Sequence, residues 1–134
     1  MAAAVFRATA LALASAACTT IAADARTFEG TRWHVTAIDG KATPATGDYR
    51  MEFNTGEISG RFGCNGWRGS YAVKGETLTA SQVRSTLMAC PEPAMSFESR
   101  GLAVLGEPMR VTWMAGTKLT LSNSAGSIAM ERIR

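Results

Sequence analysis

Two cysteines are the residues of this sequence best suited to chemistry. Cys64 lies in Gly60-Arg-Phe-Gly-Cys-Asn-Gly-Trp67, and Cys90 ends Ser85-Thr-Leu-Met-Ala-Cys90. A nucleophilic or redox-active thiol needs a neighbouring base or positive charge, or a Cys-x-x-Cys spacing, and that spacing is absent. A disulfide between the two would close a loop of about 27 residues and add about 3.5 kcal/mol to the free energy of unfolding. We therefore predict a structural Cys64–Cys90 disulfide, with two buried free thiols as the alternative.

The other reactive side chains form no catalytic or metal-binding pattern. His34 is the only histidine, whereas zinc takes three or four Cys, His or carboxylate ligands. We interpret it as a partly exposed residue of a strand. Glycosidases use two converging carboxylates, but the glutamates are spread over different expected elements: Glu52, Glu57, Glu76, Glu92, Glu98 and Glu107. We expect a non-enzymatic protein without a metal or a cofactor.

Glycines at intervals of three residues surround the first cysteine: Gly60, Gly63 and Gly66. A phosphate-binding loop would end in Lys-Ser or Lys-Thr and lead from a strand into a helix, which this segment does not. Glycine and asparagine both accept positive φ, so we predict a sharp bend at 63–66 that Asn65 stabilises through its side chain. Arg61 and Arg68 flank this bend and would form a small positive patch if exposed.

The first 25 residues have the order of a secretory signal peptide. One positive charge, Arg7, precedes an apolar run over residues 8–17, and small residues follow, with cleavage sites after Ala23 and Ala25. The run is shorter than the roughly 20 residues that a membrane-spanning helix needs. We therefore predict a signal peptide at residues 1–25 and one domain at residues 26–134.

Cys18 leaves two forms of export open. The segment from Ser15 to Cys18 partly fits a lipoprotein signal, but such signals usually carry Leu three residues before the cysteine, where this chain has Ser15. Soluble release would remove Cys18 and leave an even number of cysteines. We expect soluble release into the periplasm, with a lipid anchor at Cys18 as the alternative.

The charges of the chain are mixed. Fourteen Lys and Arg against eleven Asp and Glu give a net charge of +3, without a basic cluster. Nucleic-acid binding needs a basic patch or stripe, and no segment after the first 25 residues is apolar enough to span a membrane. We expect a monomer with no nucleic-acid partner and no membrane span in the mature chain.

Most of the chain alternates polar and apolar residues with period two, the pattern of half-buried strands. In the first expected strand, Trp33, Val35 and Ala37 point to one face, whereas Thr36 and Ile38 point to the other. Segments 49–53 and 57–62 form a hairpin, and 67–73 pairs with 77–83. Three more short strands are expected at 109–114, 119–121 and 127–133.

One helix is expected after the Pro91-Glu-Pro93 segment, because proline is favoured in the first turn. Residues 94–105 carry apolar side chains at helical spacing, and Gly106 ends the helix. About eight short strands and one helix make a mainly β (α+β) fold. We predict a small curled antiparallel sheet or barrel with the helix covering one end.

Two short motifs lie close together in the middle of the chain, Gly63-Cys-Asn65 and Thr86-Leu-Met-Ala-Cys90. With them, residues 30–133 resemble the META domain family, the HslJ-like heat-shock and envelope proteins. The other segments that carry the resemblance are Trp33, Ser59-Gly60, Gly69-x-Tyr71 and Leu119-Thr-Leu121.

The resemblance implies an exported or membrane-anchored bacterial protein with a mainly β fold and one helix. Family members are tied to heat induction, antibiotic tolerance and secretion, without an established enzymatic activity. Their helix usually carries Glu followed three residues later by a large apolar residue, but here Gly101 follows Glu98. The resemblance implies a structural role for six residues of the motifs: Gly60, Gly63, Asn65, Gly66, Thr86 and Met88.

From the residues and the resemblance together we expect a stress-related protein-interaction domain of the cell envelope, whose partners are unknown envelope proteins. A small-ligand-binding β-barrel protein is the alternative, because barrel mouths are common ligand sites. An uncharacterised hydrolase is the second alternative.

Overall fold

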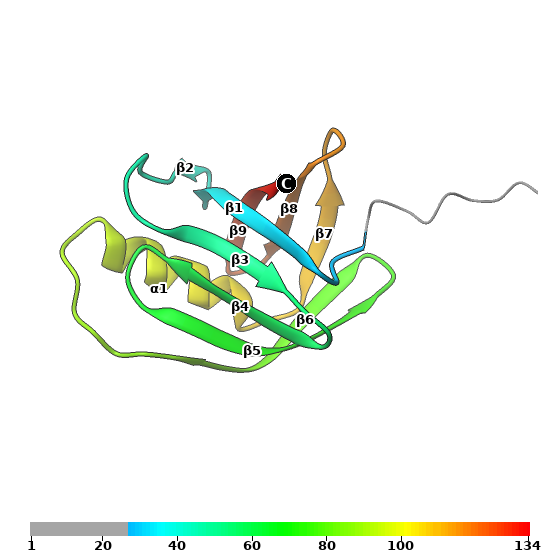
Figure 1. Cartoon of the computed structure of the whole chain (residues 1–134), viewed down its shortest axis with the longest axis horizontal. Coiled ribbons are helices and arrows are strands. Elements are labelled where there is room, and N and C mark those ends of the chain that lie inside the picture. Colours follow the sequence, from blue (N-terminus) through cyan, green and yellow to red (C-terminus); the bar gives the residue numbers. More distant parts are fainter. Residues whose placement is uncertain (1–26) are drawn as a thin grey trace, which may run out of the picture.

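The computed structural model describes residues 27–134 as nine strands and one helix (Figure 1). The predicted signal peptide and Cys18 lie outside the described residues. The strands are β1 (Thr31–Ile38), β2 (Lys41–Ala42), β3 (Tyr49–Phe53), β4 (Glu57–Phe62), β5 (Gly66–Lys74), β6 (Thr77–Ser85), β7 (Met109–Trp113), β8 (Lys118–Asn123) and β9 (Gly126–Ile133), and the helix is α1 (Ala94–Leu105).

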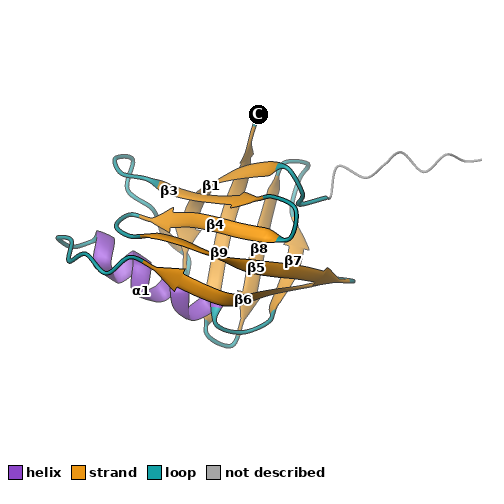
Figure 2. Cartoon of the chain, turned by 60° about the horizontal axis from the view of Figure 1, so that its bottom comes forward, coloured by secondary structure: helices purple, strands orange, loops and turns teal. Residues whose placement is uncertain are grey.

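Eight of the strands close into an antiparallel barrel. They pair in the order β1-β3-β4-β5-β6-β7-β8-β9, and β9 pairs back with β1 (Figure 2). The two-residue strand β2 pairs only with the end of β1. The seam between β6 and β7 is the shortest in the barrel, with two residue pairs against six between β1 and β9. The predicted fold class is confirmed.

A β-bulge in β1 changes which side chains face the core. The register with β9 shifts between Val35 and Ala37. Because one extra residue turns all later side chains to the opposite face, Ile38 is fully buried together with Trp33 and Val35, whereas Ala37 is half-buried. The expectation that Ile38 faces away from Trp33 is wrong, since a strict period-two pattern does not allow for the bulge.

Helix α1 begins after Pro93 and lies across one end of the barrel (Figure 2). It contacts β1, β4, β6 and β9. Its buried side is made of residues at helical spacing: Phe97, Glu98, Gly101, Val104 and Leu105. The helix therefore covers one opening of the barrel, as the sequence predicts.

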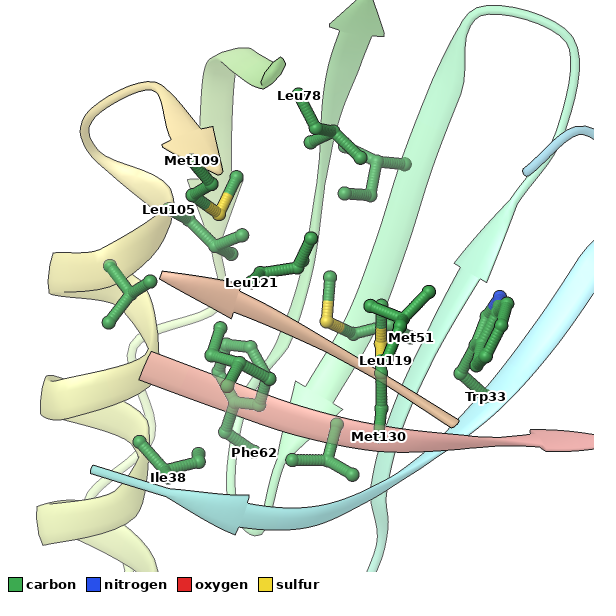
Figure 3. Packing of buried hydrophobic residues seen from close by; sticks show 14 of the residues in the cluster. Trp33, Ile38, Met51, Phe62, Leu78, Leu105, Met109, Leu119, Leu121 and Met130 are labelled. Atoms are coloured by element: carbon green, nitrogen blue, oxygen red, sulfur yellow. The ribbon is translucent and has the colours of Figure 1, made fainter. Parts of the chain in front are cut away.

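Large apolar side chains fill the barrel (Figure 3). The largest that are fully buried are Trp33, Ile38, Phe53, Met51, Ile58, Phe62, Leu78, Leu105, Met109, Leu119, Leu121 and Ile128. At the end away from α1, the ring of Phe28 packs 4.7 Å from Phe53 and 5.7 Å from Trp113, centroid to centroid. Both ends of the barrel are thus covered, one by the helix and one by aromatic rings.

Candidate functional site

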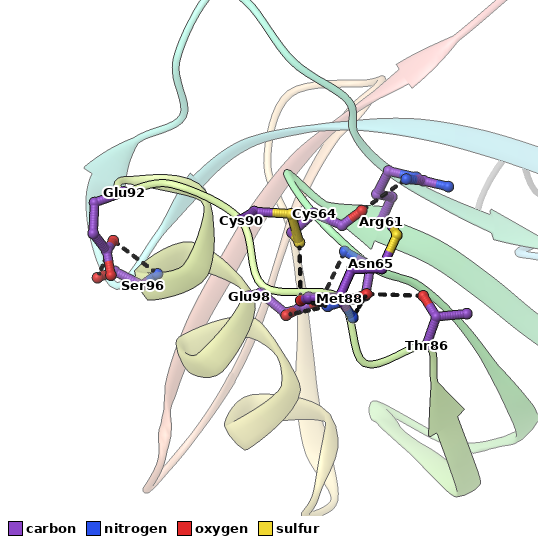
Figure 4. The surroundings of a disulfide bond; sticks show 9 residues. All are labelled: Arg61, Cys64, Asn65, Thr86, Met88, Cys90, Glu92, Ser96 and Glu98. Atoms are coloured by element: carbon purple, nitrogen blue, oxygen red, sulfur yellow. Dashed lines mark hydrogen bonds between the residues drawn. A yellow bond between two sulfur atoms is a disulfide. The ribbon is translucent and has the colours of Figure 1, made fainter.

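The chain bends sharply between β4 and β5, where the two sequence motifs meet. Gly63 has a φ of +94°, and a Cβ added there would lie 2.5 Å from the hydroxyl of Tyr49, so only glycine fits. The guanidinium of Arg61 donates a hydrogen bond of 2.7 Å to the carbonyl of Cys64 and holds the bend. Cys64 is joined to Cys90 by a disulfide with a Cα–Cα distance of 6.0 Å (Figure 4).

The side chain of Asn65 uses its donors and acceptor on two segments, residues 86–88 and helix α1 (Figure 4). Its Oδ1 accepts hydrogen bonds from the backbone N–H of Met88 at 2.8 Å and from the hydroxyl of Thr86 at 2.9 Å. Its Nδ2 donates to the carbonyl of Met88 at 3.0 Å and to Oε2 of Glu98 at 2.9 Å. Asn65 is only 2% exposed, so these bonds replace water completely.

Glu98 of α1 is the carboxylate at the centre of this network. It is 5% exposed, and its Oε1 accepts a 2.8 Å hydrogen bond from the backbone N–H of Asn65. Burying a carboxylate costs free energy unless its oxygens are hydrogen-bonded, and here each oxygen has an N–H donor from the same asparagine. Glu98 thereby ties the helix to the bend.

The network fixes the backbone of the segment Thr86–Cys90 while leaving its side chains outside. The N–H of Thr86 bonds the carbonyl of Gly66 at 3.1 Å, Met88 is held by Asn65 through both its N–H and its carbonyl, and Cys90 is cross-linked. Yet Leu87 is 94% exposed and Met88 is 57% exposed. This segment, called the pinned loop below, presents apolar side chains on a constrained backbone.

The family to which this chain is similar covers the residues of the site just described. The META domain matches residues 26–132, which is most of the chain and includes both motifs. The chain belongs to the META domain family.

Solved structures agree with this fold. The chain is similar to a protein from Burkholderia xenovorans solved by NMR, with 26% identity and a TM-score of 0.67 over 81% of this chain and 86% of that one. It is also similar to a second NMR structure, with 22% identity and a TM-score of 0.69 over 81% of this chain and 93% of that one. No curated protein sequence matches the chain significantly.

The META domain brings most of the motif residues together, although Asn65 bonds other partners than expected and Gly66 is not required to be glycine. Asn65 was expected to stabilise its own bend, but it bonds the pinned loop and α1 instead, and Arg61 holds the bend. Gly60 allows a close approach of strands, since a Cβ there would lie 2.3 Å from the Arg50 carbonyl. Gly66 has neither positive φ nor a crowded Cβ position, so its backbone does not require glycine.

Two residues of this META domain network escape the sequence analysis. Glu98 is noted there as one of six scattered glutamates and as part of the helix pattern, and Arg61 only as a flanking charge. The signal for Glu98 is its place on the buried side of an amphipathic helix, one residue after Phe97. A carboxylate at a core-facing position needs partners, and a nearby Asn is a suitable one.

The arrangement offers little reactive chemistry within residues 27–134. His34 is exposed on β1, opposite Arg50 of β3 and Glu131 of β9, and is not part of the network. No three Cys, His, Asp or Glu side chains of the described part gather as a metal-ligand set. No helix in that part has the length and hydropathy to cross a bilayer. What the site does provide is a fixed apolar surface.

Proposed function

We propose that this META domain is a non-enzymatic, exported protein of the cell envelope that acts under stress by contacting other proteins through its pinned loop. The observation that supports this proposal is the 94% exposure of Leu87 on a backbone held by hydrogen bonds and a disulfide. A fixed backbone loses little conformational entropy on binding. The order of the first 25 residues supports export.

The partner surface that fits the pinned loop is an apolar pocket able to take one or two unbranched or γ-branched side chains. Leu87 and Met88 are adjacent and both project into solvent. Methionine adapts its shape to irregular pockets, and a leucine that passes from water into such a pocket contributes about 1.5–3 kcal/mol. The network beneath the loop holds the backbone that carries both side chains.

The test is cross-linking in the native envelope, comparing the wild type with Leu87→Asp. We expect one or more proteins to be captured by the wild type and lost with Leu87→Asp. Met114→Asp is the matched control, because Met114 is 59% exposed at a different place on the barrel. Capture that is equal in both variants, or no specific capture by the wild type, would refute the role of the loop.

A further inference from the structure

The outer face of the barrel carries a hollow of about 570 Å³ over β3, β4, β5 and β6. The small residues Ser59, Gly60 and Gly66 lie in it. Larger polar side chains surround them: Arg50, Glu52, Arg68, Arg84 and Thr86. The hollow is open to solvent and is separate from the filled interior of the barrel.

Two of these arginines face each other directly. Arg68 of β5 and Arg84 of β6 are register partners on neighbouring strands, and both are exposed. Like charges directly opposite each other in an antiparallel pair are unfavourable. Neither arginine forms an ion pair with any residue of the range 27–134.

The nearby carboxylates do not compensate for this pair. Glu52 bonds Nε of Arg50 at 3.4 Å, and Asp48 pairs with both Arg50 and Arg61. Glu57, the outward residue of β4 two positions before Ser59, forms no ion pair among the described residues. The positive charge left over in the hollow is therefore that of Arg68 and Arg84.

We propose that this hollow binds a phosphate group, carried either by a soluble phosphorylated molecule or by a phospholipid headgroup. Each guanidinium can donate two parallel N–H bonds to an oxyanion. Arg68 and Arg84 are cross-strand partners that both line the hollow. Phosphate, with three or four oxygens, can accept bonds from both guanidiniums more readily than a carboxylate with two. Ser59 of β4 is the register partner of Arg68 and also lines the hollow. The volume leaves room for the organic part of the ligand.

This inference does not depend on the proposed protein contact, because it concerns the face of β3–β6 rather than the pinned loop. An anion seated between Arg68 and Arg84 would neutralise their repulsion. Without it, the pair lowers the stability of the sheet, a cost that natural proteins accept at functional sites.

The first experiment follows amide chemical shifts while the protein is titrated with inorganic phosphate, at ionic strength held constant with sodium chloride. We expect saturable shifts centred on Ser59, Gly66, Arg68 and Arg84. Arg68→Gln and Arg84→Gln should each raise the Kd for phosphate about tenfold. Arg68→Lys keeps the charge but not the fork and should also raise it. Arg110→Gln on β7 is the control with the same charge change, since Arg110 is exposed and lies outside the hollow.

The second experiment identifies the source of the phosphate with vesicles of phosphatidylglycerol and of phosphatidylcholine. Binding to phosphatidylglycerol that is lost in Arg68→Gln assigns a lipid headgroup, whereas phosphate binding without vesicle binding assigns a soluble ligand. In phosphate-free buffer, Arg84→Gln should melt at the wild-type temperature or above, because the repulsion is removed. Non-saturable shifts, equal weakening by Arg110→Gln, or a clear loss of stability in Arg84→Gln would overturn the proposal.

Discussion

A single amide side chain, that of Asn65, connects parts of the chain that are far apart in sequence. It bonds Thr86 and Met88, which lie 21 and 23 residues away, and Glu98, which lies 33 residues away. Asparagine suits this position because its two donors and one carbonyl oxygen can serve N–H, C=O and carboxylate partners at once. Neither aspartate nor leucine, which have a similar size, offers that combination.

Truncation of this side chain should be costly. Asn65→Ala leaves the buried carboxylate of Glu98 and the backbone groups of Met88 with fewer partners, so we expect the free energy of unfolding to fall by about 2–4 kcal/mol. Urea denaturation measures this, with Asn54→Ala at an exposed turn as the control. In a double-mutant cycle, Asn65→Ala and Glu98→Ala should couple by about 1–3 kcal/mol. Additive effects would contradict a shared network.

Tyr49 makes the free energy of unfolding depend on pH in the alkaline range. Burial raises the pKa of its phenol above the ordinary value of 10.0. Above that value the unfolded chain loses the proton while the folded chain keeps it, so stability present below pH 10 is lost as the pH rises toward the raised pKa. Burial, with the negative charge of Glu29 as a smaller cause, also raises the pKa of Tyr71.

We therefore expect the wild type to lose stability more steeply than Tyr49→Phe as the pH rises above about 10. Denaturant unfolding at several pH values measures both slopes. Tyr49→Phe combined with Tyr71→Phe should have a flatter profile still. Parallel profiles for the wild type and Tyr49→Phe would show that Tyr49 titrates normally in the folded protein.

At the scale of elements, the close packing of α1 against the barrel depends on a glycine that faces an aromatic ring. A Cβ added to Gly101 would lie 2.4 Å from Cδ2 of Phe62, the last residue of β4. Phe62 therefore occupies the space that a larger side chain at position 101 would need.

Gly101→Ala should destabilise the protein although alanine is the better helix former. The gain in helix propensity is about 1 kcal/mol, whereas overpacking of a core costs about 1–3 kcal/mol. We expect a net loss of about 1–2 kcal/mol in thermal or urea unfolding. Ser99→Ala on the exposed side of α1 should stabilise slightly. Adding Phe62→Leu should recover part of the loss, and a failure to do so would show that the contact is unimportant.

The elements could largely be predicted from the sequence, because each depends on local patterns. Period-two alternation and turn residues mark the hairpin of β3 and β4, and Pro93 with Gly106 brackets α1. The bulge after Val35 was missed, since nothing in the local pattern announces an extra residue. The Asn65–Glu98 contact was missed because it joins residues from a bend and a helix, whose relative placement depends on closure of the whole barrel.

At the scale of the whole molecule, the Cys64–Cys90 bond joins the bend after β4 to the segment before α1. Cys64→Ser and Cys90→Ser should each lower the free energy of unfolding by about 2–5 kcal/mol, because the unfolded chain gains conformational freedom. The double variant should be no less stable than either single variant, since one bond is lost in all three. Denaturant unfolding under non-reducing conditions measures this.

The oxidation state itself is checked by thiol titration of the denatured, unreduced mature protein. We expect no reactive thiol. Two reactive thiols per chain would refute the cross-link in the mature protein, and the stability argument would then not apply.

Intact-mass measurement of protein from the native envelope tests the signal peptide in the same sample. A start near residue 24 or 26 supports soluble release, a diacylated Cys18 supports anchoring, and retention of residues 1–25 would contradict both.

The short seam between β6 and β7 sets where the barrel opens first. Only Thr77 and Leu78 pair there with Arg110 and Met109, so from Thr79 onward β6 has a strand neighbour on one side alone. Proteins open locally where few backbone bonds must break. Amide hydrogen exchange should therefore be fastest along this stretch of β6 and slowest in β1 and β9, and a fluctuation that parts the seam lets α1 and the β5–β6 hairpin move without unfolding the rest.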